Sequence, residues 1–325
     1  MPSPHLTLWR GRRSAPFTSP LYTVNPFDRA VLSWNATGSA SFELEVGGTW
    51  HSMGTSGSRP RSKKTEFVDV DTLVLSDRVR RFRFRFTPRK GCAVTLVAVT
   101  HWLAKTQIVY RRQRSAAWGK ILSVPERSQF EIESPPGRLC SPTSLAMVLE
   151  FHGVKISTPK VAAGVYDHAA KLYGNWPFNT AFAHRASAVV RASRPLRFPS
   201  PPRAVAPASV PTGLRGDGAT LSSFVQHARS LADLEAEILA GRPAIASIRW
   251  QPGQLDGAPL PRSSGHLLVV KGFTQSGDVV VNDPAVSPGQ IERVYKRRQF
   301  HDAWLKRGSG IFYVIADCRL RIADR

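Results

Sequence analysis

The spacing of apolar residues changes near residue 115 of this 325-residue chain, and this change limits the possible folds more than any other feature. Before it, apolar and polar residues alternate, as in ASFELEV and in RRFRFRF, where Phe82, Phe84 and Phe86 are separated by arginines. Alternation over short segments bounded by turn residues is typical of half-buried strands. Several such segments between residues 17 and 110 predict an all-β sandwich or jelly-roll domain, preceded by a basic tail over residues 1–16.

Beyond a predicted linker at residues 111–123, the pattern over residues 124–325 mixes helices and strands. Residues 141–151 carry apolar side chains at helical spacing, with Pro142 in the first turn and Gly153 after the last. Further helices are predicted over residues 160–173, 231–239 and 298–305, and strands in PAIASIRW, GHLLVVKGF, GDVVVND and GIFYVIA. Helices followed by a mostly antiparallel sheet predict an α+β domain.

One segment of this second domain has no periodic pattern. Residues 184–218 are rich in proline, arginine, alanine and serine, as in PLRFPSPPRAVAPASVPTG. Such a composition buries too little apolar surface to offset the entropy of ordering the chain. The segment is therefore interpreted either as a disordered insertion or as the product of an altered reading frame.

The chain is strongly basic, with a formal net charge of +22. The arginines are scattered, and no helix shows a basic stripe interleaved with stacking aromatic residues, so nucleic-acid binding is not expected as the main function. Contact of the basic β-domain with an anionic cell-surface polymer fits the charge better, although a solvated arginine face explains it too. No apolar run reaches about 18 residues, so no membrane span is expected. The start has no apolar signal region, which favours the cytoplasm.

Three cysteines, Cys92, Cys140 and Cys318, are too few and too far apart for a disulfide framework or a CxxC metal pair. HExxH, GxSxG and glycine-rich phosphate-loop motifs are absent from the sequence. We therefore expect no metal and no cofactor. Only Cys140 has an unusual setting, at the start of the helix in GRLCSPTSLAMVLEFHG, where the helix dipole favours a thiolate.

A thiolate nucleophile needs a base, and the base needs an acceptor that orients it. His266 begins the first strand of a predicted hairpin and Asp283 follows the second, so both lie at the same end of the hairpin. The backbone N–H of Cys140 and the side-chain amide of Gln129 are candidate donors to an oxyanion. Taken singly, each residue has an ordinary structural explanation: a buried thiol, a strand-edge histidine, a turn-forming aspartate. The order Gln, Cys, His, Asp favours nucleophilic catalysis.

Four segments, CSPTSLAMVLEFHG, YGNWPFNTAFA, GHLLVVKGF and VNDPA, together resemble the papain-like cysteine peptidases of the bacteriocin-processing C39 type. The closest likeness is to stand-alone bacterial members with an N-terminal β-rich domain, and it extends from about residue 124 to residue 316. The resemblance implies a papain-like fold and metal-free cleavage of peptide bonds in a peptide or protein substrate. It also implies Cys140 as nucleophile, His266 as general base, Asp283 as orienting acid and Gln129 as oxyanion donor.

The sequence departs from the family pattern at two positions. Ser141 follows the cysteine where exporter-associated members often have glycine, and Gln129 precedes Cys140 by eleven positions, a longer gap than usual. Asn282 is an alternative orienting residue, because some papain-like enzymes use asparagine. The family is commonly exported, which implies an extracellular or cell-envelope location. A catalytically silent papain-like scaffold that binds a protein or glycan together with the β-domain remains the alternative function.

Overall fold

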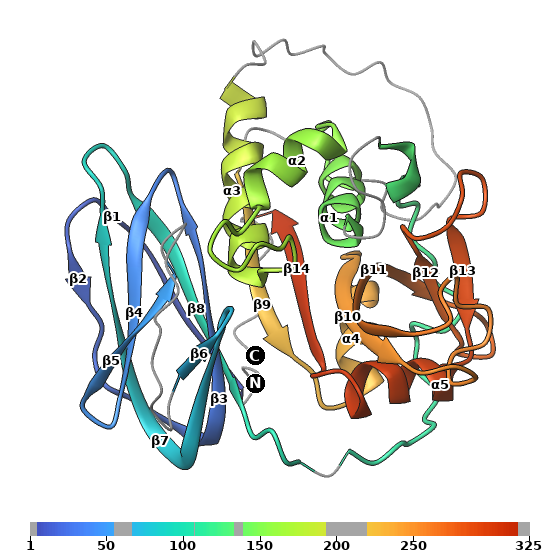
Figure 1. The fold of residues 1–325 in the computed structure, drawn as a ribbon, viewed down its shortest axis with the longest axis horizontal. Helices are drawn as coiled ribbons and strands as arrows, with labels where there is room; N and C mark the ends of the chain where they lie inside the picture. Colours follow the sequence, from blue (N-terminus) through green and yellow to red (C-terminus); the bar gives the residue numbers. More distant parts are fainter. Residues whose placement is uncertain (1–4, 55–66, 107, 133–138, 193–219, 318–325) are drawn as a thin grey trace, which may run out of the picture.

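The structure is a computed structural model, and it describes residues 5–54, 67–106, 108–132, 139–192 and 220–317. An all-β domain lies beside an α+β domain, and the chain passes from one to the other through residues 103–123 (Figure 1). Both predicted fold classes are therefore confirmed. No helix within these ranges is long and apolar enough to cross a membrane.

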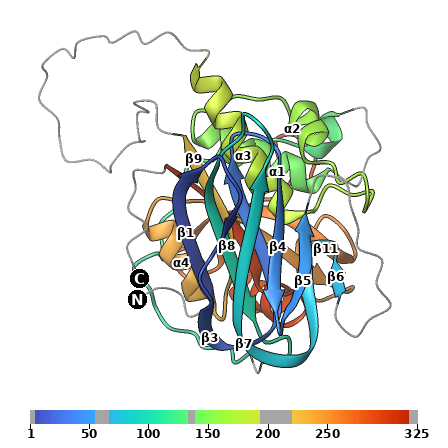
Figure 2. The same ribbon diagram turned by 90° about the vertical axis from the view of Figure 1, so that its left-hand side faces the viewer.

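The β-domain consists of eight strands, most of which follow the order β1-β8-β3-β7-β4-β5, with β2 and β6 also paired to β7. Strand β7 connects the two halves, because its first part pairs with β3 and β6 and its second part pairs with β2 and β4. Figure 2 shows this domain facing the viewer. The strands are β1 (Leu6–Arg13), β2 (Phe17–Thr18), β3 (Tyr22–Ala36), β4 (Ala40–Val46), β5 (Thr49–Gly54), β6 (Phe67–Asp69), β7 (Thr72–Pro88) and β8 (Val94–Trp102).

The alternation in RRFRFRF appears in β7 as predicted. Its three phenylalanines are buried in the core of the β-domain, whereas Arg83 and Arg85 lie on the other face and pair with glutamates of β4. The expected basic tail is corrected in one respect. Residues 6–13 form β1, which pairs with β8 at the edge of the sheet, because LTLWRGRR offers apolar residues that pack on that core and on the adjoining one.

The α+β domain is built on an antiparallel six-stranded sheet of order β13-β12-β11-β10-β14-β9. Its strands are β9 (Leu221–His227), β10 (Ala244–Trp250), β11 (Ser263–Phe273), β12 (Val279–Asn282), β13 (Glu292–Tyr295) and β14 (Ile311–Asp317). Its helices are α1 (Cys140–Phe151), α2 (Thr158–Val165), α3 (Trp176–Ala192), α4 (Leu231–Leu239) and α5 (Arg297–His301), with a 3₁₀ turn η1 (Gln129–Glu131) and a π-turn η2 (Asp302–Lys306).

Helices cover both faces of this sheet (Figure 1). Alternate residues of the central strands point to opposite sides, as the two-residue period of a strand requires. Ile245 of β10 and Val269 of β11 belong to the core shared with α1, α2 and α3, whereas Ala246 and Val270 belong to the core shared with α4, α5 and η2. The first of these cores fixes α1, and therefore Cys140, against the middle of the sheet.

Two sequence expectations in this domain are wrong. The predicted helix over residues 160–173 ends at Val165, because the Asp167 carboxylate accepts the N–H groups of Ala169 and Ala170 and holds a turn there. The segment over residues 184–218 is not irregular from its start, since α3 continues to Ala192. The rest of that segment, residues 193–218, lies outside the described residues, as does Cys318.

The two domains share a buried interface along β9, the edge strand of the six-stranded sheet. Asn35 of β3 donates to the carbonyl of Ser223 at 2.7 Å and accepts the N–H of the same residue at 3.1 Å. Ser33 accepts the N–H of Val225 at 3.1 Å, and Thr100 donates to its carbonyl at 2.6 Å. Side chains of the β-domain thus satisfy backbone groups that an edge strand leaves unpaired.

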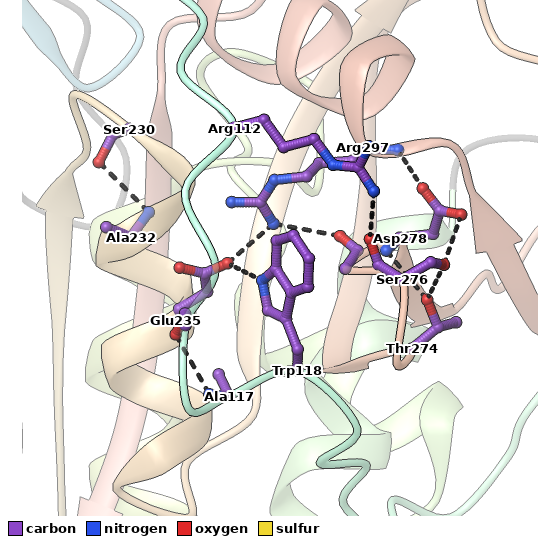
Figure 3. Close-up of polar contacts among 12 residues, drawn as sticks. Arg112, Ala117, Trp118, Ser230, Ala232, Glu235, Thr274, Ser276, Asp278 and Arg297 are labelled. Atoms are coloured by element: carbon purple, nitrogen blue, oxygen red, sulfur yellow. Dashed lines mark hydrogen bonds and ion pairs between the residues drawn. The ribbon is translucent and has the colours of Figure 1, made fainter.

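The connection between the domains is anchored to the α+β domain around Trp118 (Figure 3). The indole N–H donates to the Glu235 carboxylate of α4 at 2.8 Å, and Arg297 pairs with the same carboxylate at 2.8 Å. The guanidinium groups of Arg112 and Arg297 lie 5.7 and 5.1 Å from the Trp118 ring, within cation–π range. Beyond this anchor the chain runs along β11, where Leu122 donates to Lys271, toward η1.

Candidate active site

Cys140 is the first residue of α1 and is partly exposed. The preceding residue, Leu139, gives the helix no side-chain cap. The first backbone N–H groups of a helix have no intrahelical partner and carry partial positive charge, so the thiol lies where negative charge is favoured. The structure therefore places Cys140 at the N-terminus of a helix, as the sequence predicted.

Two serines of α1 that follow Cys140 form hydrogen bonds that fix the helix to its neighbours. Ser141 is buried and accepts a hydrogen bond from Asn179 of α3 at 2.8 Å. Ser144 donates to the carbonyl of Leu267 in β11 at 3.2 Å. The polar side of α1 is thus held by both the neighbouring helix and the sheet. The serine after the cysteine has a structural role of its own.

His266 and Asp283 lie together at one end of the β11–β12 hairpin, as predicted. The register pairs Val269 with Asn282, which brings the start of β11 beside the residue that follows β12. His266 Nε2 lies 2.7 Å from Asp283 Oδ1, and both residues are buried. Because Nε2 faces the carboxylate, Nδ1 is the ring nitrogen left for the hydrogen bond between His266 and Cys140.

Asp283 accepts hydrogen bonds at both carboxylate oxygens. Oδ1 also accepts the backbone N–H of Ala285 at 3.0 Å, and Oδ2 accepts the hydroxyl of Tyr295 at 2.8 Å. Burial would raise the pKa of this carboxyl, but the His266 charge and these donors lower it instead. An ionised carboxylate is therefore maintained at a position with no exposure to water.

The three groups shift one another's protonation. Burial alone would raise the pKa of the Cys140 thiol, but the hydrogen bond and charge of His266 and a backbone hydrogen bond with Leu267 outweigh burial and lower that pKa. Burial alone would lower the pKa of His266, but Asp283 and Cys140 raise it. Both directions favour a thiolate beside an imidazolium. Such a pair supplies a nucleophile and a proton donor in one site.

Gln129 lies in η1, beside the segment that follows Asp283. Its backbone N–H donates to the carbonyl of Pro284 at 2.9 Å, and its buried side-chain Oε1 has no hydrogen-bond partner within the described residues. The structure gives no hydrogen bond between Gln129 and Cys140 in the described ranges, and residues 133–138 between them lie outside those ranges. Gln129 thus belongs to the loop next to Asp283.

Asn282, the alternative orienting residue, faces the chain that leads to η1. Its amide nitrogen donates to the carbonyls of Val124 and Pro125 at 3.1 and 3.2 Å. Neighbouring residues 282 and 283 therefore do different things: the asparagine anchors the segment before Gln129, and the aspartate contacts His266. The aspartate is the better candidate for the orienting group.

Two aromatic residues at the site were not predicted from the sequence. Trp250 of β10 lies edge-on to the His266 ring, with the centroids 5.7 Å apart. Tyr295 of β13 reaches Asp283 from the edge of the sheet. Neither has a motif of its own. Only the pairing of β12 with β13, a strand that the sequence analysis missed, could have indicated Tyr295.

Comparison with known families gives one match, to the Peptidase_C39 like family, over residues 121–311. No curated protein matches. Among solved structures, one described as a C39-like peptidase from Bacillus anthracis is 16% identical, covers 61% of this chain and 98% of its own, and has a TM-score of 0.37. A double glycine motif protease from an AMS/PCAT transporter, solved in complex with a leader peptide, is 15% identical, covers 61% and 94%, and has a TM-score of 0.35.

Proposed function

This chain belongs to the Peptidase_C39 like family, and from that membership and the geometry around Cys140 we propose that it is a cysteine peptidase acting on a peptide or protein substrate. The observation that carries the proposal is the buried Asp283–His266 pair next to a thiol at a helix N-terminus. A structural cysteine needs no such arrangement of imidazole and carboxylate. A nucleophilic cysteine does.

In the proposed reaction, the Cys140 thiolate attacks the carbonyl carbon of the scissile amide and forms a tetrahedral oxyanion. The imidazolium of His266 gives its proton to the leaving amine, the C–N bond breaks, and a thioester remains. Neutral His266 then takes a proton from water, whose oxygen attacks the thioester; the C–S bond breaks, the carboxylic acid leaves, and the thiolate is restored beside the imidazolium. Asp283 fixes the ring so that Nδ1 faces sulfur.

The oxyanion donors in this proposal are the backbone N–H of Cys140 and the side-chain amide of Gln129. The backbone N–H of Gln129 donates to the carbonyl of Pro284, so the position of Gln129 depends on the loop that carries Asp283. Its Oε1 has no partner in the described residues, so the amide group is not committed elsewhere through that atom. Removing one oxyanion donor typically costs about 10²- to 10³-fold in rate. Gln129→Ala tests this role.

Digestion of a proteome-derived peptide library is the direct test of activity. Wild type is expected to produce new termini with a recurring sequence around the cleavage point, and Cys140→Ala is expected to produce none. Cys92→Ala serves as the matched control, because Cys92 lies in the β-domain and should leave cleavage unchanged. Equal digestion by wild type and Cys140→Ala would contradict the proposal.

The alternative is a catalytically silent papain-like scaffold that acts with the β-domain as a protein- or glycan-binding module, and the basic β-domain would favour an anionic polymer. Arg83 and Arg85 of β7 pair with Glu45 and Glu43 and lie over the ring of Trp50. These ion pairs reduce the positive charge available to a polyanion. We therefore rank this alternative second. It would gain support if the intact protein bound a polyanion and left the peptide library uncut.

A further inference from the structure

Tyr295 is the feature of the site for which neither the sequence nor the family match gives a role. It ends β13, its side chain is buried, and its hydroxyl donates to Asp283 Oδ2 at 2.8 Å. Asp283 Oδ1 is already shared by His266 and Ala285. Among the described residues, the Tyr295 hydroxyl is therefore the hydrogen-bond donor to Oδ2 of Asp283.

We propose that Tyr295 is a positioning residue that holds the Asp283 carboxylate in the orientation and the ionised state that His266 requires. This inference rests on the proposed function, and it adds a fourth side chain to the Cys140–His266–Asp283 arrangement. Tyr295 touches neither substrate nor the thiol in this scheme. It acts through Asp283.

The packing around Tyr295 supports a fixed donor. The residue pairs with Val279 of β12 in the sheet register, and its ring is stacked on Phe300 of α5 with centroids 6.5 Å apart. The register fixes the backbone of Tyr295, and burial in this core together with the Phe300 contact keeps its ring, and so its hydroxyl, directed at the carboxylate. Burial and the Asp283 charge both raise the pKa of the Tyr295 phenol well above its ordinary value, so the hydroxyl keeps its proton and remains a donor.

The charged and titratable groups around Asp283 come from three elements. His266 of β11 faces it directly, Cys140 of α1 acts on it through charge, and Tyr295 of β13 donates to it. Arg293, also on β13, acts on the tyrosine. Loss of the tyrosine donor frees Oδ2 and lets the Asp283 carboxylate rotate out of line with His266 Nε2, which weakens the contact with the imidazolium. The expected consequence is a lower pKa for His266 and a smaller thiolate fraction at Cys140.

Tyr295→Phe tests the proposal, because it removes the hydroxyl and keeps the ring. Losing the hydrogen bond from Tyr295 to the buried Asp283 charge should move the apparent pKa of the His266–Cys140 pair by about one unit. In the folded variant we expect the midpoint of the His266 NMR titration to fall by about that amount. Alkylation of Cys140 by iodoacetamide at pH 6 should slow about tenfold.

Phe300→Leu is the matched control, because it disturbs the same stack and retains the hydroxyl. Because the hydroxyl is retained, Phe300→Leu should move the titration midpoint of His266 clearly less than Tyr295→Phe does. An unchanged midpoint in folded Tyr295→Phe would overturn the proposal, and so would an equal shift in Phe300→Leu, which would assign the effect to packing. The histidine titration does not require activity. Failure of peptide cleavage would therefore count against the proposed function alone, and failure of the shift against Tyr295 alone.

Discussion

Histidines at the domain interface and in the candidate site have surroundings that shift the pKa of the ring in opposite directions. At the domain interface, burial lowers the pKa of His101 to about 4 and that of His227 to about 3. In the candidate site, burial acts on His266 in the same direction, but Asp283 outweighs it and the pKa rises to about 10. The difference shows that Asp283, which is itself fully buried, reverses the effect of burial on His266. Contact with a carboxylate is not sufficient by itself, because His301 contacts Asp302 and its pKa is still lowered by burial.

The interface histidines fit an environment that needs neutral rings. His227 stacks on Trp102 with centroids 5.0 Å apart, and His101 lies 5.3 Å from the ring of Phe27. The ring of His5 lies 6.2 and 5.9 Å from the rings of His101 and His227. Protonating one of them would place a charge among aromatic rings and other imidazoles. These histidines contribute to domain contact as aromatic surfaces.

The largest expected effect comes from removing the carboxylate that distinguishes the two regions. Asp283→Ala should lower the pKa of His266 far below its wild-type value, because only Cys140 then opposes the effect of burial. The proton donor and the thiolate are lost together at neutral pH, so peptide cleavage should fall by about 10²- to 10⁴-fold. An NMR titration of His266 and a cleavage assay measure the two effects. If His266 stayed protonated above pH 8 in folded Asp283→Ala, the explanation of its charge would be wrong.

The next effect concerns acid stability. The pKa values of His101 and His227 are lower in the folded protein than in the unfolded chain. Below pH 6.5 the unfolded chain therefore binds more protons than the folded protein, and the free energy of unfolding decreases as the pH falls toward 4. The expected slope is up to about 1.4 kcal/mol per pH unit for each histidine. Urea unfolding between pH 7 and pH 4.5 measures it. The groups that also face this cluster are His5, Arg229 and Asp233.

A variant with His101→Phe and His227→Phe should flatten this slope, because phenylalanine keeps the aromatic contacts and does not titrate. His168→Phe is the matched control, since His168 is exposed and lies beside Tyr166 away from the interface. Its slope should equal that of wild type. Equal slopes in all three proteins would show that the interface histidines do not control acid stability.

The smallest effect concerns the neutral hydrogen bonds that join the domains. Asn35→Ala leaves the N–H and carbonyl of Ser223 without partners in a buried interface, which should cost about 2 kcal/mol in free energy of unfolding. Ser33→Ala removes one bond, to Val225, and should cost about half as much. Chemical denaturation at pH 7 measures both. If Asn35→Ala lowered the free energy of unfolding by less than Ser33→Ala does, the assigned contacts would be contradicted.

The sequence predicted the parts of the fold that depend on local patterns. The alternation around Phe84 gave a strand, the Pro142 to Gly153 signals gave α1, and the hairpin pattern brought His266 and Asp283 to one end of the sheet. Each of these rests on periodicity and turn residues that lie within a few positions of one another. The end of α2 at Val165 was missed because the carboxylate of Asp167 binds backbone groups that the helix would otherwise use.

Contacts between distant segments were beyond what the pattern could predict. Asn35 binds Ser223, 188 positions away, and Asn179 binds Ser141 across 38 positions. Tyr295 reaches Asp283 only because β13 pairs with β12. These residues have no spacing rule, since a single polar side chain in an apolar strand or helix is compatible with many partners. Their partners become known only with the tertiary fold.

The thiolate absorbance of Cys140 as a function of pH tests the central claim most directly. The ultraviolet difference spectrum between wild type and Cys140→Ala isolates this thiol from Cys92 and Cys318. Since His266 lowers the pKa of the thiol against the effect of burial, we expect the midpoint of thiolate absorbance to lie below the ordinary thiol pKa in wild type and to rise in His266→Ala. A thiol that ionises only near its ordinary pKa of about 8.5, equally in both proteins, would contradict the account.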